Sequence, residues 1–550
     1  FLAAYRAPTE IQARAWPLIA SGRHLLAAAP TGSGKTLCAF LWAIDRLATG
    51  AWPGGGVRVL YISPLKALNT DIRRNLLGPL RRIEERFQAV GAPMAAVRVQ
   101  VRSGDTPAGE RRQMLRRPPE ILITTPESLN LLLSSPRARE ALRGLRTVIL
   151  DEIHAVASNK RGTHLITAVE RLVLLSGEFQ RLALSATVRP LERAAAFVGG
   201  YRLREAGAGE AVYAAREVAI AQDRGAKRIE VTVRFPQPPP APASREASIW
   251  PALVDECRRA IHAGRSTLLF TNTRRHAEKL ARLINEAEGR VLAYAHHGSL
   301  ARELRAAVEA RLKRGELKAI VATSSLELGI DIGALDQVLL VQTPFSVASA
   351  LQRIGRAGHA VDRTSRGVLL ALHGRDLLDA AVMARSVLDQ EIEELRPVLC
   401  PLDVLAQIIL SMVGVERWDI DRLYAVLRAG YPFHTLSRPQ FQRVLDLLAG
   451  RYADCRIREL ASRVSIDRMD NSIEARRGAL ALLYRAGGTI PDRGCYELRL
   501  AGSRTKIGEL DEEFVWERRV GDAFIFGTQS WRIRGIDARS VEVIPWDGPL

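Results

Sequence analysis

The sequence has few cysteines and no long apolar run, and these absences exclude several classes of protein. No apolar run among its 550 residues approaches the roughly 18 residues that a membrane-spanning helix needs. Zinc sites and disulfide frameworks need closely spaced cysteines, so neither is predicted, and a reduced, cytoplasmic setting fits best. The five cysteines are far apart and form no Cys-x-x-Cys pair: Cys38, Cys257, Cys400, Cys455 and Cys495.

Lysine is also scarce, since only eight of the 79 basic residues are lysines. Codon bias in a GC-rich genome explains the preference for arginine. It does not explain why basic residues outnumber the 60 acidic ones and leave a net charge of +19. Because the electrostatic field of so positively charged a protein attracts a polymer of phosphates, charge alone favours nucleic acid as the partner.

The length of the chain predicts three or four domains. It begins with Phe1 and has no signal peptide, and its last residues, Trp546 to Leu550, resemble the middle of a domain. We therefore expect a piece of a longer protein.

Short apolar runs alternate with helical patterns in two stretches, which is typical of parallel sheets buried on both faces. The sequence thus predicts an α/β protein with two doubly wound domains, at 1–200 and 201–390, the second containing a proline-rich linker at about 236–248. Residues 228–235 alternate like an exposed strand. The first set of strand candidates is Leu25–Ala29, Val59–Ser63, Val97–Val101, Ile121–Thr124, Val148–Leu150 and Leu182–Ser185. The second set is Thr267–Thr271, Val291–Tyr294, Ala319–Ala322, Gln337–Val341 and Val368–Leu372.

The pattern becomes helical beyond residue 390 and β-rich from about residue 495. The expected helices are Leu402–Val413, Ile420–Leu427, Phe441–Leu448 and Arg477–Tyr484. The expected strands near the end are Phe524–Phe526 and Ser540–Ile544.

A phosphate loop is predicted at residues 29–36, APTGSGKT, between the first strand and a helical run. Glycines let the backbone curl so that N–H groups point at phosphates, and the helix N-terminus adds partial positive charge. This pattern predicts ATP and Mg²⁺ as cofactors, with Lys35 at the β- and γ-phosphates and the Thr36 hydroxyl on Mg²⁺. The residues expected to line the nucleotide here are Thr31, Gly32, Ser33, Gly34 and Lys35.

An acidic motif, Asp151-Glu152-Ile153-His154, follows the strand that ends at Leu150. The carboxyl end of such a strand lies beside the phosphate loop. Asp151 is expected to hold Mg²⁺, and Glu152 to polarise the attacking water. His154 is not needed for this chemistry, so we expect it to couple the nucleotide state to nucleic-acid contacts. An incidental acidic strand end is the alternative, which the presence of Lys35 disfavours.

Two arginines lie three positions apart in QRIGRAGH, residues 352–359. Residues at this spacing share one face of a helix, so we expect Arg353 and Arg356 to point the same way. A solvated basic helix is the alternative, because the chain is rich in arginine.

The order of the remaining motifs resembles that of superfamily 2 helicases. TEIQ at 9–12 resembles the Q motif, SPLKAL at 63–68 motif Ia, TTPES at 124–128 motif Ib and SAT at 185–187 motif III. FTNTR at 270–274 resembles motif IV, ATS at 322–324 with DIG at 331–333 motif V, and QRIGRAGH motif VI.

This resemblance implies that Gln12 reads the adenine and that Arg353 and Arg356 reach the γ-phosphate from the second domain. It adds Gly329 and Asp331 to the nucleotide site. It implies coupling roles for Ser185, Thr187 and Gln352, beside His154. The implied nucleic-acid contacts are Lys66, Thr124, Thr125, Arg274 and Thr323.

Finer features resemble the Lhr (large helicase-related) family. NKRG at 159–162 follows the acidic motif, motif VI ends in Gly358-His359, and GELDEEFV at 508–515 precedes RVGD and SWRI. The resemblance implies two tandem RecA-like domains, a winged helix at 391–500 and the start of a β-barrel domain at 501–550. It also implies an ATP-dependent 3′-to-5′ helicase that acts on tailed DNA or RNA:DNA duplexes, in DNA repair.

The motifs leave two other functions open: a remodeller that uses ATP as a switch without processive unwinding, and an RNA helicase. An unrelated ATPase with a phosphate loop does not explain motifs Ia, Ib, V and VI together. Trp516, Trp531 and Trp546 suggest stacking on bases, although packing within the β-rich region is favoured. His296 and His297 have no partner at metal-binding spacing.

Overall fold

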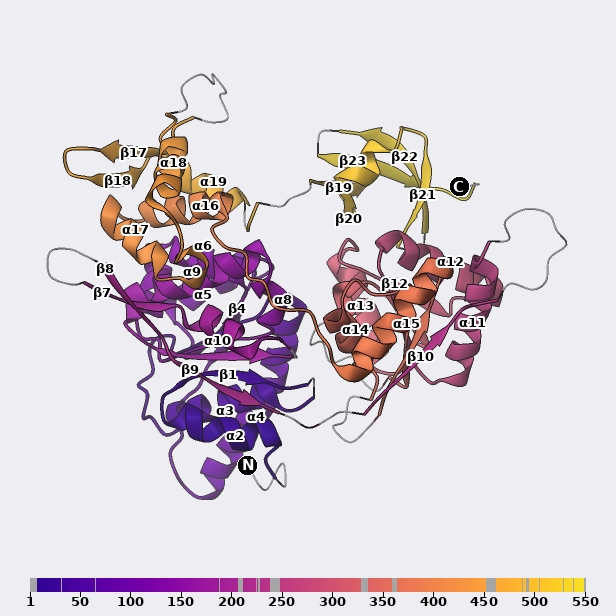
Figure 1. Cartoon of the computed structure of the whole chain (residues 1–550), viewed down its shortest axis with the longest axis horizontal. Helices are drawn as coiled ribbons and strands as arrows, with labels where there is room; N and C mark the ends of the chain where they lie inside the picture. Colours follow the sequence, from indigo (N-terminus) through magenta and orange to yellow (C-terminus); the bar gives the residue numbers. More distant parts are fainter. Residues whose placement is uncertain are drawn as a thin grey trace. The chain divides into compact units, whose positions relative to one another are not determined.

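The chain forms two compact units, shown in a computed structural model (Figure 1). Unit 1 comprises Phe1–Ala29, Ser33–Arg224 and Glu394–Ile490, and unit 2 comprises Pro30–Gly32, Gly225–Glu393 and Pro491–Leu550. The structure describes residues 7–30, 32–64, 66–186, 188–205, 211–223, 225, 228–237, 248–327, 335–358, 364–451, 461–486, 488–490, 494–503, 505–527, 529–537 and 539–548.

A seven-stranded parallel sheet with the order β3-β4-β2-β5-β6-β1-β9 forms the centre of unit 1. Its strands are β1 (His24–Ala28), β2 (Val59–Ile62), β3 (Val99–Arg102), β4 (Ile121–Thr124), β5 (Thr147–Leu150), β6 (Gln180–Ser185) and β9 (Val218–Gln222). The helices are α2 (Glu10–Ala20), α3 (Lys35–Ala48), α4 (Lys66–Ala89), α5 (Ala108–Arg116), α6 (Pro126–Leu133), α7 (Pro136–Leu142), α8 (His154–Ala157), α9 (Lys160–Ser176) and α10 (Leu191–Gly199).

Side chains of successive strand residues enter two different cores, as the period of a strand requires. Val59 and Tyr61 of β2 pack with α2, α3 and α4, whereas Leu60 and Ile62 pack with α6, α9 and α10. The sheet is therefore buried on both faces, which confirms the prediction of a doubly wound domain.

The first sheet extends beyond the boundary that the sequence suggested at residue 200. The segment 201–222 forms an antiparallel pair, β7 (Tyr201–Glu205) and β8 (Ala211–Ala215), and then β9, which pairs with β1 along its whole length. Unit 1 consequently continues to Arg224, and unit 2 resumes at Gly225. Strand β9 was not among the predicted strands, although residues 218–221, VAIA, form a short apolar run.

Unit 2 contains a six-stranded parallel sheet with the order β10-β15-β14-β11-β13-β12. The expected exposed strand at 228–235 is confirmed as edge strand β10, whereas residues 238–247 of the expected linker lie outside the described residues. The strands are β10 (Ile229–Arg234), β11 (Thr267–Thr271), β12 (Ala293–His296), β13 (Ala319–Ala322), β14 (Gln337–Val341) and β15 (Ser365–Leu370). The helical elements are α11 (Trp250–Ala263), α12 (Arg274–Glu288), α13 (Arg302–Lys313), η2 (Ser324–Leu326), α14 (Val347–Ile354) and α15 (Gly374–Asp389).

A winged-helix domain belongs to unit 1. Its three-stranded antiparallel sheet has the order β16-β18-β17, and its apolar core is built from the helices and this hairpin. The elements are α16 (Leu402–Val413), β16 (Trp418–Asp419), α17 (Ile420–Arg428), η3 (Tyr431–Phe433), α18 (Arg438–Leu448), β17 (Val464–Asp467), β18 (Ser472–Ala475) and α19 (Ala479–Ala486).

A curled five-stranded sheet, with the order β20-β19-β23-β22-β21, belongs to unit 2. It begins at Cys495, a few residues before the expected start at 501. Trp531 is buried in its core and donates from Nε1 to the Phe526 carbonyl at 2.8 Å, whereas Trp516 is 70% exposed. The elements are β19 (Cys495–Leu500), β20 (Lys506–Asp511), α20 (Glu512–Trp516), β21 (Ala523–Phe526), β22 (Gln529–Ile536) and β23 (Ser540–Pro545).

The described helices include none with the length and apolarity that a bilayer crossing requires.

Candidate nucleotide site and nucleic-acid motifs

The phosphate loop connects β1 to α3 through a backbone that only glycine adopts easily. Gly32 and Gly34 have φ angles of 84° and 82°, in the left-handed region, and Gly34 is the N-cap of α3. The Lys35 side chain is buried and donates from Nζ to the Ala29 carbonyl at 2.5 Å. Lys35 therefore lies along the inside of the loop, while Thr31 falls outside the described residues.

The Q motif braces this loop from α2. Thr9 donates from its hydroxyl to the Ser33 carbonyl at 2.8 Å, and Gln12 donates from Nε2 to the Gly34 carbonyl at 3.2 Å. A Cβ atom on Gly34 would lie 2.6 Å from Gln12 Nε2, the end of a flexible side chain, so it is the φ of 82° that favours glycine at this position. Gln12 thus holds the loop in this structure, and adenine recognition by Gln12 stays a prediction.

The acidic motif begins where β5 ends, as the sequence predicted. Asp151 is buried beside Tyr61 of β2, whose hydroxyl donates to Asp151 Oδ2. Burial, and then the neighbouring Glu152 carboxylate, raise the pKa of Asp151 well above that of an ordinary aspartate, against the opposing influence of Tyr61 and Lys35. A cation next to Asp151 would relieve this cost. The oxygen atoms of Asp151 and Thr36 are the kind of ligand that Mg²⁺ prefers, so the pair fits a nucleotide-bound Mg²⁺.

A chain of contacts runs from Glu152 to motif III. Glu152 has a φ of 48° and a buried side chain, and its Oε2 lies 3.5 Å from Nε2 of His154. His154 Nδ1 accepts from the Ala186 N–H at 3.2 Å and lies 3.1 Å from the Ser185 hydroxyl. Since Nδ1 is an acceptor, the proton of the neutral ring is on Nε2, facing Glu152.

Motif III in turn contacts the phosphate loop. The Ala29 N–H donates to the Ser185 carbonyl at 3.1 Å. The geometry therefore links Glu152, His154, Ser185 and Ala29 in series, in the arrangement that a coupling role for His154 and Ser185 needs. Thr187 lies outside the described residues.

Motif VI lies in unit 2, with both arginines buried. Arg353 donates from Nε to Glu327 Oε2 at 3.0 Å and from one terminal nitrogen to Asn272 Oδ1 at 3.2 Å. The expectation that Arg353 and Arg356 share a helix face is wrong, because α14 ends at Ile354 and Arg356, 1% exposed, lies in the following turn. Gln352 is half-buried, and Gly329 and Asp331 lie outside the described residues.

The residues expected to contact nucleic acid lie in different environments. Thr124 and Thr125 are buried, and the Thr124 hydroxyl donates to the Arg102 carbonyl while the Thr125 hydroxyl accepts from the Ser128 N–H. Thr323 is buried at the end of β13, and Arg274 begins α12 and pairs with Asp511 at 3.0 Å. Lys66 begins α4, and the structure does not describe its side chain. All five roles stay predictions.

Sequence reasoning missed several residues that organise these motifs. Tyr61 lies within the apolar run of a predicted strand, and nothing in the sequence indicated that its hydroxyl would form a hydrogen bond with Asp151. His296 and His297 lie beside carboxylates, with Nε2 atoms 3.1 Å from Glu309 Oε1 and 2.7 Å from Glu278 Oε1. In the described part of the chain, no group of three His, Cys, Asp or Glu side chains could hold a metal ion.

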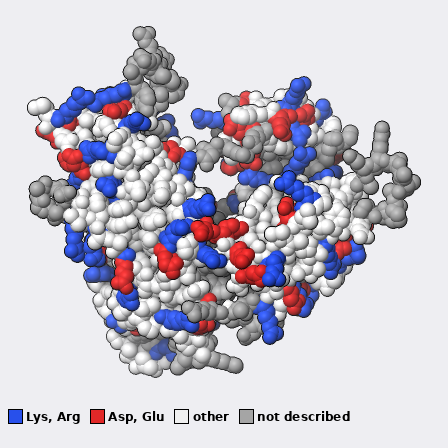
Figure 2. Space-filling view, in the orientation of Figure 1, with Lys and Arg blue, Asp and Glu red and all other residues white. Residues whose placement is uncertain are grey.

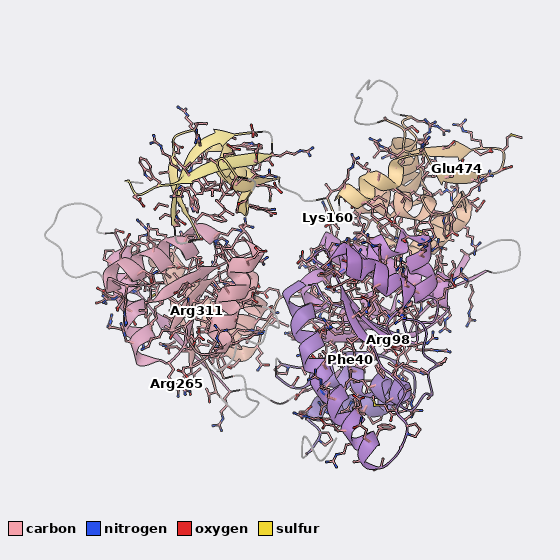
Figure 3. The ribbon with its side chains drawn as sticks, turned by 180° about the vertical axis from the view of Figure 1, so that it is seen from behind. Phe40, Arg98, Lys160, Arg265, Arg311 and Glu474 are labelled. Atoms are coloured by element: carbon pink, nitrogen blue, oxygen red, sulfur yellow. The ribbon has the colours of Figure 1, made fainter. Side chains whose placement is uncertain are left out.

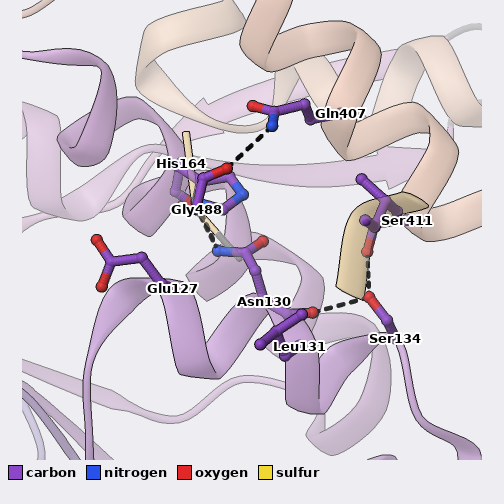
Figure 4. A pocket seen from close by; sticks show the side chains of 9 residues that line it. Glu127, Asn130, Leu131, Ser134, His164, Gln407, Ser411 and Gly488 are labelled. Atoms are coloured by element: carbon purple, nitrogen blue, oxygen red, sulfur yellow. Dashed lines mark hydrogen bonds between the residues drawn. The ribbon is translucent and has the colours of Figure 1, made fainter. Parts of the chain in front are cut away.

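A small polar cavity lies where the winged helix meets the first α/β domain (Figure 4). Ser134 and Ser411 share a hydrogen bond of 2.7 Å across it, and Gln407 donates to the Gly488 carbonyl at 3.0 Å. His164 and Asn130 also line the cavity. This contact is built from hydrogen bonds as well as apolar packing.

On the face shown in Figure 2, basic side chains are dispersed among acidic ones, so the excess positive charge does not form one continuous basic patch on that face.

Comparison with known proteins agrees with this geometry. Residues 9–194 match the DEAD/DEAH box helicase model, residues 250–361 the helicase conserved C-terminal domain, and residues 385–548 the winged helix domain of large helicase-related protein. The fold and its motifs are those of a superfamily 2 helicase motor with two RecA-like domains.

Two curated relatives cover the whole chain. The chain is 44% identical to "Lhr helicase/probable uracil glycosylase" of Mycolicibacterium smegmatis and 42% identical to "Lhr helicase/uracil glycosylase" of Escherichia coli, and it spans 38% of each relative's length. A solved structure, Mycobacterium smegmatis helicase Lhr bound to ssDNA and AMP-PNP, matches 90% of this chain and 62% of that chain, with a TM-score of 0.80 and 46% identity. The chain belongs to the Lhr family.

Proposed function

We propose that this chain is the motor of an ATP-dependent 3′-to-5′ helicase that acts on single-strand-tailed DNA or RNA:DNA duplexes, in DNA repair in the cytoplasm. One observation carries the proposal: the series of contacts from Glu152 through His154 and Ser185 to the phosphate loop. A site that only bound ATP would not need a histidine between its acidic motif and motif III. The similar Mycobacterium smegmatis helicase, described as bound to ssDNA and AMP-PNP, supports the same function.

Within this proposal, unit 1 supplies the groups that bind ATP and activate water. Lys35, Gly34 and the N-terminus of α3 hold the phosphates. Thr36 and Asp151 would hold Mg²⁺, which would neutralise phosphate charge. Glu152 orients and polarises the attacking water. The positive φ of Glu152 fixes its backbone in a conformation that directs the side chain within a buried site.

Unit 2 supplies positive charge for the transition state. Arg353 and Arg356 are the proposed contacts to the γ-phosphate, where arginine stabilises charge that develops during transfer. Glu327 and Asn272 hold Arg353 ready, because together they fix its guanidinium plane. Hydrolysis removes the γ-phosphate and so removes the contact that the arginines make. The states with and without this contact are the two conformational states between which a motor must switch.

A panel of tailed duplexes tests the proposal. DNA and RNA are placed in each strand, with 3′ or 5′ tails, and ATP-dependent strand displacement is measured. Displacement of 3′-tailed DNA or RNA:DNA duplexes is expected. Displacement of RNA duplexes alone would identify an RNA helicase. ATP turnover stimulated by single strands, without displacement of any duplex, would identify a remodeller and refute the unwinding function.

A further inference from the structure

The segment Asn159–Gly162, which follows the acidic motif, has no role in the nucleotide site. Asn159 is the N-cap of α9 and the next three residues form its first turn, directly after α8, which begins at His154. A Cβ atom on Gly162 would lie 2.2 Å from the Val156 carbonyl oxygen and 2.9 Å from the Ala157 Cα. The two helices therefore approach so closely that only glycine fits, and α9 cannot shift without moving α8.

Arg161 connects this segment to motifs Ia and Ib. It donates from Nε to Glu127 Oε1 at 2.7 Å and from a terminal nitrogen to the Pro64 carbonyl at 2.6 Å. Pro64 follows β2, and Glu127 lies in the first turn of α6, which follows β4. Since β2 and β4 are neighbours in the sheet, one guanidinium joins the two segments that emerge from adjacent strands.

The same end of α9 also contacts the winged helix. Lys160, which is labelled in Figure 3, pairs with Asp403 of α16 at 3.0 Å. The Thr163 hydroxyl donates to the Val398 carbonyl at 3.0 Å. One turn further along, His164 contacts Asn130 of α6. The contacts of Lys160, Thr163 and His164 therefore fix the position of the first turn of α9, and with it the backbone of Arg161.

We propose that Arg161 is a positioning residue for nucleic-acid binding by unit 1. Its side chain fixes the motif Ia and Ib segments relative to each other and connects both of them to helices α8 and α9, which follow the acidic motif. This inference rests on the proposed function. The tie to Pro64 and Glu127 needs a planar group with several donors, which arginine has and lysine lacks. Because Arg161 acts on the segments and not on phosphate, its loss should weaken the binding of nucleic acid more than the chemistry.

The test compares Arg161→Gln with a matched control, Arg193→Gln. Arg193 also bonds one carboxylate and one backbone carbonyl, those of Glu394 and Leu395, at 3.2 and 2.8 Å, and lies away from motifs Ia and Ib. The two arginine side chains are similarly exposed, at 35% and 36%. ATP turnover is measured against the concentration of a single-stranded DNA oligonucleotide, and melting temperature is measured for each variant.

The half-stimulating concentration is the DNA concentration that gives half of the maximal stimulation of ATP turnover. For Arg161→Gln it should rise about tenfold, as expected for the loss of charge-assisted hydrogen bonds. ATP turnover at saturating DNA should stay within about twofold of the parent value. Arg193→Gln should keep the parent value. Arg161→Lys should restore part of the affinity, because it keeps the charge but only one of the two bonds.

Two further variants guard against simple misfolding. Glu127→Gln should raise the half-stimulating concentration about threefold, and Arg161→Gln with Glu127→Gln should cost no more than Arg161→Gln alone, since both remove one interaction. Values for Arg161→Gln equal to those for Arg193→Gln, additive effects, or an equal fall in saturated turnover and affinity would each overturn the inference. A parent chain whose turnover ignores single strands would instead refute the proposed function.

Discussion

The two parallel sheets are built alike but carry different chemistry at the ends of their strands. In unit 1 these ends present Lys35, Asp151 and Glu152, which can bind phosphate and activate water. In unit 2 the corresponding positions present Thr323 and His296, and the nearby Arg353 is held by Glu327 and Asn272. The comparison teaches that one fold can carry different chemistry, because the chemistry depends on a few side chains at one edge of the sheet, and the proposed function gives each sheet a different part of the reaction.

Their buried polar groups differ as well. The buried histidine of unit 1, His164, lies near Arg171 and Arg161, whereas those of unit 2, His296 and His297, lie beside Glu309 and Glu278. Mutation of these histidines should therefore have different effects in the two units.

The largest effect is expected from Arg353 in unit 2. Arg353→Ala should lower ATP turnover by about 10³–10⁵-fold, because an arginine at the γ-phosphate stabilises the transition state. Steady-state turnover with saturating single-stranded DNA measures this. Arg366→Ala, at an exposed arginine of the same unit that pairs with Glu230, is the control and should change little. Turnover near the parent value in Arg353→Ala would show that the unit 2 edge takes no part in the chemistry.

Lys35→Ala in unit 1 should reduce turnover by roughly 10²–10³-fold, the usual cost of removing one preorganised charge from a transition state. Salt-sensitive binding of DNA should remain largely intact, because Lys35 is buried in the phosphate loop. Turnover assays and a fluorescence binding titration separate the two properties. Retained turnover would refute the nucleotide site.

Acid should destabilise unit 1 through His164. Burial, and then the positive charge of Arg171, lower the pKa of His164 from 6.5 to about 4. Protonation therefore favours the unfolded chain, so the contribution is fully present above pH 6.5 and is lost as the pH falls toward 4. Between pH 7 and 4 we expect about 2–3 kcal/mol of lost stability, measured by urea unfolding with hydrogen exchange resolved by unit.

The control for this pH effect is His164→Gln, which removes the titrating group. Its unfolding free energy should depend less on pH by the same amount. Identical pH dependence in the parent and in His164→Gln would assign the acid sensitivity to other groups.

His154→Ala tests the contacts that connect the two ends of the unit 1 site. We expect ATP turnover to stay within about threefold of the parent and duplex displacement to fall about tenfold, since one buried hydrogen-bonded link between the acidic motif and motif III is lost. The two rates are measured on the same tailed substrate. An equal loss of both would contradict a coupling role.

The smallest effect is expected at Arg274 of unit 2. Its exposed pair with Asp511 adds little stability, about 0–1 kcal/mol, so the side chain is available for phosphate. Arg274→Ala should reduce the slope of log affinity against log salt by about 0.7 if one contact to single-stranded DNA is lost. An unchanged slope would remove Arg274 from the predicted contacts.

Much of the fold followed from local patterns. Strands Ile121–Thr124, Thr267–Thr271, Ala319–Ala322 and Gln337–Val341, and helix Leu402–Val413, have the bounds that the sequence predicted. Buried parallel strands read as unbroken apolar runs with helices between them, which is the strongest pattern available in a sequence. The edge strand β9 was missed although residues 218–221, VAIA, form an apolar run, because so short a run does not by itself distinguish a strand from other structure.

The candidate site was predictable where a motif is contiguous and unpredictable where it is not. Lys35 and Gly34 follow from one loop, and Asp151 from one strand end. The partners Tyr61 for Asp151 and Glu327 for Arg353 come from other parts of the chain, and no spacing rule connects them. The prediction that Arg353 and Arg356 share a helix face was wrong because the helix ends at Ile354, two residues before Arg356.

By itself, the sequence determined the order of the motifs, the two doubly wound sheets and membership of the Lhr family, because each depends on residues near one another in the chain. Only the tertiary structure decided that His154 lies between Glu152 and Ser185, that Val218–Gln222 pairs with β1 in the first sheet, and that Arg161 joins motifs Ia and Ib. Side-chain hydrogen bonds act over about 3 Å, so they are set by which strands become neighbours, and strand order is a property of the folded chain.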